Sequence, residues 1–402
     1  MYLSKLQNLQ HFVNKAYILL YFFVVPVAFN NLVSMGYLAL SLFLVVLQVI
    51  IGARVNKADV FKALLLVLSL FVIIAFSTYS KTNSILVFVY AIICYFSYKS
   101  FENPANRKAF NFDWFYWLSL LAICIKLVLQ IIDKGLFFDS FELGTGAWDK
   151  NYSAVALFCF FVYCDQTHRR SILWKIVGLV VLFYLRSSRG SLLLGFLFIG
   201  FKILSYYLKR KGVVGFDLKS DKSFSQKRVL LCLAFSLVFV IGFSYFWTYY
   251  VSASGVTAYH ESLNDGSNAT RFRANVYAVQ QLLSNHRFLF YGYDNDIRFI
   301  LGDIDALDFT RFEGYRLVQS HNSFLNMAIK NGLLFTIFYF VFLFASFKKV
   351  FKISNCPYLI SLFVISMFMH GIFVTDYLLF FLVSIYSGCN HTLRNSTYHR
   401  FR

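Results

Sequence analysis

The chain has 402 residues, of which 59% are hydrophobic and only 14% are charged. A soluble domain carries roughly a quarter charged residues, so this composition excludes an ordinary soluble protein. The formal net charge of +19 does not indicate nucleic-acid binding, because membrane proteins collect Lys and Arg in the loops between their apolar runs.

The apolar runs predict an all-α, polytopic integral membrane protein. A spanning helix needs about 20 mostly apolar residues, and lipid offers no hydrogen-bond partner to an open strand. The runs are continuous rather than alternating, which argues against a β-barrel. We expect a single membrane domain over 1–402 with about 12 transmembrane helices, near residues 17–33, 36–53, 62–79, 84–98, 113–132, 151–165, 172–187, 190–207, 229–250, 322–347, 357–373 and 376–390.

The loops predict the orientation of these spans. Loop 208–228 holds seven Lys or Arg residues against two Asp, and further basic residues follow spans two, four, six and ten. All of these loops fall on one side of the membrane, together with both termini. That side is expected to be the cytoplasm, because cytoplasmic loops carry the excess of Lys and Arg.

The opposite side is expected to carry one large loop, 251–320, between spans nine and ten. It contains six Arg, eight Asp or Glu and no Lys. Within it, Val276, Val279, Leu283 and Phe290 recur near helical spacing. We therefore expect a helical lid over this outer face.

Several polar residues share the outer face in this topology. Guanidinium grips phosphate oxygens bidentately and tolerates partial burial, so Arg residues here are candidates for holding a phosphate group. Arg189 is alternatively an interfacial, snorkelling side chain, and the two lid arginines alternatively form salt bridges within the acidic loop. The candidates are Arg189 before span eight, Arg271 and Arg273 in the lid, His321 and Asn322 before span ten, and Asn151 before span six.

His321 is the candidate general base. An imidazole with a near-neutral pKa accepts a proton from a hydroxyl nucleophile, and Asn322 would orient the ring. Alternatively, His321 only caps the tenth span. Lys330, Asn331 and Gly332 are expected to break that span, either to leave a short entry helix or to kink a helix that lines a cavity.

Two further outer residues, His370 and Asp376, either line the cavity or cap helices. The His and Cys residues lack the spacing of metal ligands, so no metal and no cofactor are expected.

Four segments together resemble the O-antigen ligase and polymerase superfamily. "HNSFLNMAIKNGLL" is similar to its His-Asn-x-x-Leu…Gly-Leu signature, and "SSRGSLLLG" looks like its Ser-Arg-Gly motif. "RANVYAVQQLLSNHRFLFYGYDND" resembles its lid helix with the following glycine loop, and "DKNYSAVAL" resembles the asparagine-containing start of a span. The glycine loop departs from the family pattern, since Asp294 follows Gly292-Tyr293 where a second glycine is usual.

The resemblance implies a glycosyltransferase of the Gram-negative inner membrane with a periplasmic active site. Such enzymes pass a glycan from undecaprenyl diphosphate to an acceptor hydroxyl, without metal. The resemblance carries the essential His over to His321 and the two arginine positions to Arg189 and Arg273, with Arg271 as a neighbour of similar placement. Asn322, Asn151 and Gly292 are expected to bind substrate.

"YGYDND" resembles the ligases more than the polymerases, so the expected reaction joins the O-antigen glycan to a lipid A–core sugar, with inversion at the anomeric carbon. The first alternative is a polymerase, whose acceptor is another lipid-linked repeat unit. A second alternative is a transporter of a lipid-linked sugar, which should show an inverted repeat that we do not find in the sequence. The expected partners are the lipid-linked donor, the lipid A–core acceptor and membrane lipids.

Overall fold

The structure is a computed structural model. It describes residues 2–76, 82–102, 113–136, 141, 143, 150–167, 178, 189–211, 225, 231, 234–235, 238–246, 275–276, 278–280, 282–283, 286–292, 322–347, 350–351, 355–369, 371–372 and 376–387. Predicted span 172–187 apart from residue 178, and nearly half of 229–250, therefore lie outside the described residues, as do most of loop 208–228 and most of lid 251–320.

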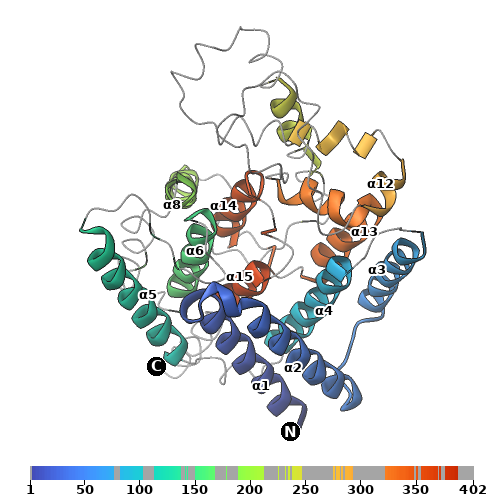
Figure 1. The fold of residues 1–402 in the computed structure, drawn as a ribbon, viewed down its shortest axis with the longest axis horizontal. Coiled ribbons are helices and arrows are strands. Elements are labelled where there is room, and N and C mark those ends of the chain that lie inside the picture. The colour runs from blue at the N-terminus through green and yellow to red at the C-terminus, as the bar shows by residue number, and fades with distance from the viewer. Residues whose placement is uncertain are drawn as a thin grey trace.

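The described part of the chain is helical and contains no strand. The helices form one bundle (Figure 1). Their bounds are α1 (Tyr2–Ile18), the π-helix η1 (Leu19–Val24), the 3-10 turn η2 (Val27–Phe29), α2 (Asn30–Ile50), α3 (Lys57–Phe76), α4 (Thr82–Glu102), α5 (Asp113–Lys134), α6 (Lys150–Thr167), α8 (Arg189–Arg210), α12 (His286–Tyr291), α13 (Ser323–Ser346), α14 (Cys356–Ser366) and α15 (Asp376–Ser387).

Within the described residues, five helices are long and apolar enough to cross a membrane: α2, α3, most of α4, most of α5, and α13. Only 33% of the α2 span, 28% of α3 and 22% of α5 is buried in the bundle, against 67% of α4 and α13. A soluble monomer rarely exposes so much contiguous apolar surface to water. The outer helices therefore have faces suited to lipid, as expected of a membrane protein.

Helix α6 lies at the centre of the bundle, packed against α15 and α8 (Figure 1). Every residue from Ser153 to Gln166 is buried. A helix that is buried on all sides belongs to the core of a large bundle and has no lipid-facing stripe.

The predicted first span, 17–33, is wrong as a continuous helix. The chain is already helical from Tyr2, and the helix ends at Val24. Val25 is extended (φ −77°, ψ 135°), the conformation that a following proline imposes, and α2 starts only at Asn30. Pro26 thus separates two helices that the apolar run joins in sequence.

Helix α1 belongs to the core although it is polar. Asn14 is fully buried, and its side chain accepts a hydrogen bond from Tyr37 (2.9 Å) and donates one to Ser97 Oγ (2.8 Å). The buried Lys15 ammonium lies 5.7 Å from the centre of the Tyr163 ring. Because α2, α4 and α6 satisfy these polar groups, α1 can pack inside the bundle.

Candidate functional site

The start of α13 is fixed by Asn322, which stands directly after His321 in the chain. The Asn322 side chain accepts hydrogen bonds from the amides of Phe324 and Leu325, both at 3.0 Å, and it is completely buried. This is an N-cap, so the residue that caps the tenth predicted span is Asn322. Its expected contact with substrate stays a prediction.

Ser323 fastens this helix start to the segment that joins α14 to α15. Its hydroxyl donates to the carbonyl of Met369 (2.5 Å) and accepts from the amide of Ile372 (3.2 Å). One buried hydroxyl thus holds the entry of α13 against the turn that follows α14. Helix α14 ends at Ser366, earlier than the predicted 357–373 span, because the chain turns there.

The same segment leads to the start of α6. Tyr377, in the first turn of α15, has its ring centre 5.5 Å from that of Tyr152 in the first turn of α6. Asn151 precedes Tyr152 and is half-buried. The structure therefore brings the starts of α6, α13 and α15 to one end of the bundle, with Asn151 and Asn322 on two of them. We call this end the junction.

Asp376 is the buried carboxylate of the junction. It accepts a hydrogen bond from the Tyr17 hydroxyl (2.5 Å), which also lies 3.2 Å from the Tyr90 hydroxyl. The sequence left open whether this residue caps a helix or lines a cavity; the structure makes it the centre of a tyrosine cluster joining α1, α4 and α15. An acidic residue at the start of an apolar run marked Asp376 in the sequence. Its tyrosine partners could not be predicted, because Tyr17 and Tyr90 lie far from it in the chain.

Helix α13 is broken at Gly332, as Lys330-Asn331-Gly332 predict. Gly332 has φ 78° and ψ 157°, which is far from helical geometry. Thr336 Oγ1 donates to the Gly332 carbonyl (2.7 Å), and Asn331 accepts from Ser84 Oγ of α4 (2.8 Å). These contacts hold the polar groups that the break exposes, so the kink is a fixed part of the bundle.

Gly292, which follows the short lid helix α12, packs directly on this break (Figure 1 shows α12 beside α13). A methyl group at Gly292 would lie 2.7 Å from the carbonyl oxygen of Lys330, and one at Gly332 would lie 2.6 Å from the carbonyl carbon of Phe290. Both positions also have positive φ. The close approach of two backbones therefore requires glycine on each side. The expected role of Gly292 in binding substrate stays a prediction.

The helical turns of 275–283 pack on the first half of α13. Ala278 and Leu282 form a buried cluster with Leu325, Ala328 and Ile329. The buried Asn275 donates to Ser244 Oγ (3.4 Å), which ties the start of these turns to helical residues 238–246. The lid and the start of α13 are thus in direct contact.

The predicted apolar stripe of the lid is partly wrong. Val276 is buried as expected, but Leu283 and Phe290 are 71% and 46% exposed. The packed face includes Ala278 and Leu282, and the predicted Val279 is partly buried against the same cluster.

Five candidate residues are not placed as side chains. His321, Arg271 and Arg273 lie outside the described residues, as does His370. Arg189 is the first residue of α8, as its motif predicts, but only its backbone is described. The structure places their chain neighbours: Asn322 after His321, and Asn275 two residues after Arg273.

Among the described residues, no three or more His, Cys, Asp or Glu side chains are grouped as a metal site would need. The expectation of chemistry without a metal stays a prediction. Comparisons with protein-family models, with curated proteins and with solved structures find no match to this chain.

Proposed function

We propose that the chain is an O-antigen ligase, a glycosyltransferase of lipopolysaccharide biosynthesis in the Gram-negative inner membrane. It would transfer a glycan from undecaprenyl diphosphate to a hydroxyl of a lipid A–core sugar at the periplasmic face. Both termini and loop 208–228 would be cytoplasmic, and lid 251–320 would be periplasmic. The proposal rests on the four sequence segments that resemble the superfamily.

The structural observation that supports it most is the contact between lid residues 275–283 and α13. Arg273 stands five residues before Ala278, and His321 stands four residues before Leu325; Ala278 and Leu325 share one buried cluster. These two residues come from segments that are far apart in the sequence. Packing of this kind brings the flanks of both candidates to the same part of the bundle.

The proposed reaction is a direct displacement at the anomeric carbon. His321 would take the proton of the acceptor hydroxyl as the new C–O bond forms, and the bond to the lipid diphosphate would break on the opposite face. Arg189 and Arg273 would stabilise the charge on the departing diphosphate. Asn151 and Arg271 would contact the donor at the rim of this site.

A reconstitution experiment tests the function. The purified full-length protein should join an undecaprenyl-diphosphate glycan to lipid A–core in detergent, without ATP and in the presence of a chelator. Formation of longer lipid-linked chains without lipid A–core would instead identify a polymerase. Donor movement across a vesicle membrane without any joined product would identify a transporter.

Replacement of Arg273 by lysine should lower transfer about tenfold, because an ammonium keeps the charge but loses the bidentate grip on phosphate. The measurement is kcat/KM for the donor in the same reconstituted system. Arg271→Lys is the matched comparison, since it makes the same change two residues away. Equal, wild-type transfer by both variants would exclude a lid arginine from the donor site.

A further inference from the structure

A second polar region lies at the end of the bundle away from the junction. Helix α4 starts beside α13, where Ser84 contacts Asn331, and carries Lys99 in its last turn. Helix α3 ends with Phe76 stacked on Tyr291 and starts near Asp59. Fifteen to seventeen helical residues, or about 25 Å, separate these contacts with Asn331 and Tyr291 from Lys99 and Asp59 in the second region. This is close to the thickness of a bilayer core.

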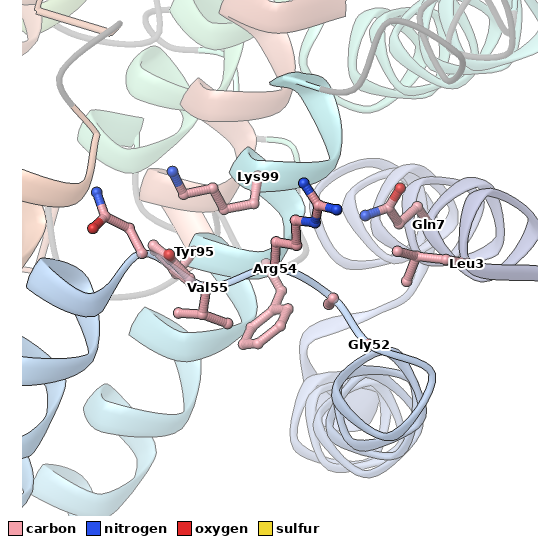
Figure 2. Close-up of a pocket in the computed structure, with 10 residues that line it drawn as sticks. Leu3, Gln7, Gly52, Arg54, Val55, Tyr95 and Lys99 are labelled. Carbon is pink, nitrogen blue, oxygen red and sulfur yellow. The ribbon is translucent and has the colours of Figure 1, made fainter.

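This region contains a cavity of about 730 Å³. Its walls are the start of α1, the end of α4 and loop 52–56 between α2 and α3 (Figure 2). The loop reaches across the cavity because Gly52 adopts φ 95°, which closes α2 with a bond from the Ala53 amide to the Gln48 carbonyl (2.8 Å). The backbone thereby places Arg54 at the cavity.

Arg54 and Lys99 make the cavity cationic. Figure 2 shows Arg54 between Gln7 of α1 and Lys99 of α4. Arg54 is exposed and makes no hydrogen bond or ion pair with any residue that the structure describes. Its guanidinium is therefore available to an anion entering the cavity.

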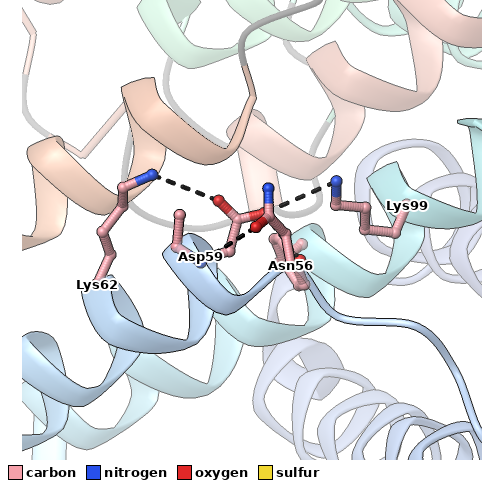
Figure 3. A network of polar contacts seen from close by, with 6 residues as sticks. Asn56, Asp59, Lys62 and Lys99 are labelled. Carbon is pink, nitrogen blue, oxygen red and sulfur yellow. Dashed lines mark hydrogen bonds and ion pairs between the residues drawn. The ribbon is translucent and has the colours of Figure 1, made fainter.

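Within the described residues, the Asp59 carboxylate pairs with two lysines of this region. Asp59 is buried and lies 3.4 Å from Lys62 and 3.7 Å from Lys99, which approach it from opposite sides (Figure 3). The Tyr95 hydroxyl also donates to Asp59 (3.1 Å). Among the side chains that the structure describes in this region, one negative charge thus stands against the three positive charges of Arg54, Lys62 and Lys99. The excess of two positive charges suits a phosphate group.

The surroundings of the cavity are apolar and lie at the ends of two candidate spans. Leu3, Val55 and Phe96 line it beside the polar groups. Ile50, at the end of α2, and Phe61, in the first turns of α3, are 72% and 63% exposed. An anion bound by Arg54 would thus lie at headgroup level, with apolar helix faces continuing toward the middle of the bilayer.

We propose that this cavity binds the phosphate headgroup of an anionic phospholipid. Arg54 and Lys99 contact the phosphate oxygens, and the acyl chains lie along the exposed faces of α2 and α3. A basic pocket between helix ends at a membrane surface is a known means of holding acidic lipids. The exposed apolar faces favour a lipid over free phosphate, which would use only the charges. This site is independent of the proposed glycosyl transfer.

The test uses full-length protein purified in a neutral detergent. Native mass spectrometry would compare retention of phosphatidylglycerol, phosphatidylcholine and inorganic phosphate by the wild type, Arg54→Gln and Arg210→Gln. Arg210 is the matched control, because it is an exposed arginine at the end of α8, away from the cavity. Arg54 is exposed, so its replacement should not disturb folding, which a melting curve would check.

The wild type should retain phosphatidylglycerol in preference to phosphatidylcholine. Arg54→Gln should weaken that retention about fivefold, the usual contribution of one basic residue near a lipid phosphate. Arg210→Gln should leave the retention unchanged, because Arg210 does not line the cavity. Equal retention of the two lipids, or an equal effect of both variants, would overturn the proposal. So would inorganic phosphate binding as tightly as the lipid.

Discussion

Replacement of His321 by alanine should reduce glycan transfer to lipid A–core by about 10²- to 10⁴-fold, the usual contribution of a general base. The acceptor hydroxyl would then have to lose its proton to water. Cells that carry only this variant should show bare lipid A–core on a lipopolysaccharide gel. The initial rate of the reconstituted reaction gives the magnitude.

The matched control is His286→Ala, which removes an exposed histidine from α12. It should leave both the gel and the rate unchanged. Melting curves on both purified variants separate loss of catalysis from loss of folding, since Asn322 still caps α13 in either variant. Continued glycan attachment by well-folded His321→Ala protein would refute the role of this residue.

Replacement of Gly332 by alanine should destabilise the bundle strongly and loosen the lid. The methyl group would lie 2.8 Å from the carbonyl carbon of Tyr291 and nearer still to the Phe290 carbonyl, and backbone atoms cannot move aside as a flexible side chain would. We expect about 1–3 kcal/mol of strain from a backbone conformation that is almost restricted to glycine and about 1–3 kcal/mol from overpacking. The melting temperature and the protease sensitivity of 275–292 measure the two effects.

Gly135→Ala separates these two contributions. Gly135, which follows α5, has a similar φ of 83°, but no atom lies within 4 Å of a methyl group placed there. It should show the backbone strain alone and leave the lid intact. A Gly332→Ala protein no less stable than Gly135→Ala would mean that the contact with α12 does not hold the lid.

Much of the fold follows from continuous apolar runs. The predicted spans 36–53, 62–79, 84–98, 113–132 and 190–207 correspond to α2, α3, α4, α5 and α8, with ends that differ by a few residues. The strength of this signal has a physical origin, since a helix facing lipid must be apolar over most of its length.

The predictions of spans fail where an apolar run is not one continuous helix, or where a buried helix is not apolar. Pro26 lies inside an apolar run and breaks it, so one predicted span became two helices. Helix α1 buries Gln10, Asn14 and Lys15 in the core. Because these residues are polar, a prediction based on apolar runs does not identify the helix. Only the three-dimensional partners of these side chains explain why the helix is buried.

The candidate site also has features that the sequence predicted and features that it did not. The glycine break in α13 was predictable, because Gly332 follows two polar residues inside an apolar run. The contact of Gly332 with Gly292 and the tyrosine cluster around Asp376 were not, because each joins segments distant in sequence. The packed face of lid residues 275–283 was predicted only in part. Val276 is buried and Val279 is partly buried as predicted, whereas Leu283 is exposed and Leu282 is buried in its place.

The complete burial of α6 bears on how the protein is assembled. During synthesis α6 is made before α8, α14 and α15, although these helices later provide much of its surroundings. Its Asp165 accepts a hydrogen bond from Tyr358 of α14, and the Lys202 ammonium of α8 lies 3.9 Å away. A carboxylate in lipid is costly until such partners arrive. The central helix is therefore made early, and its packing is completed only by the last part of the chain.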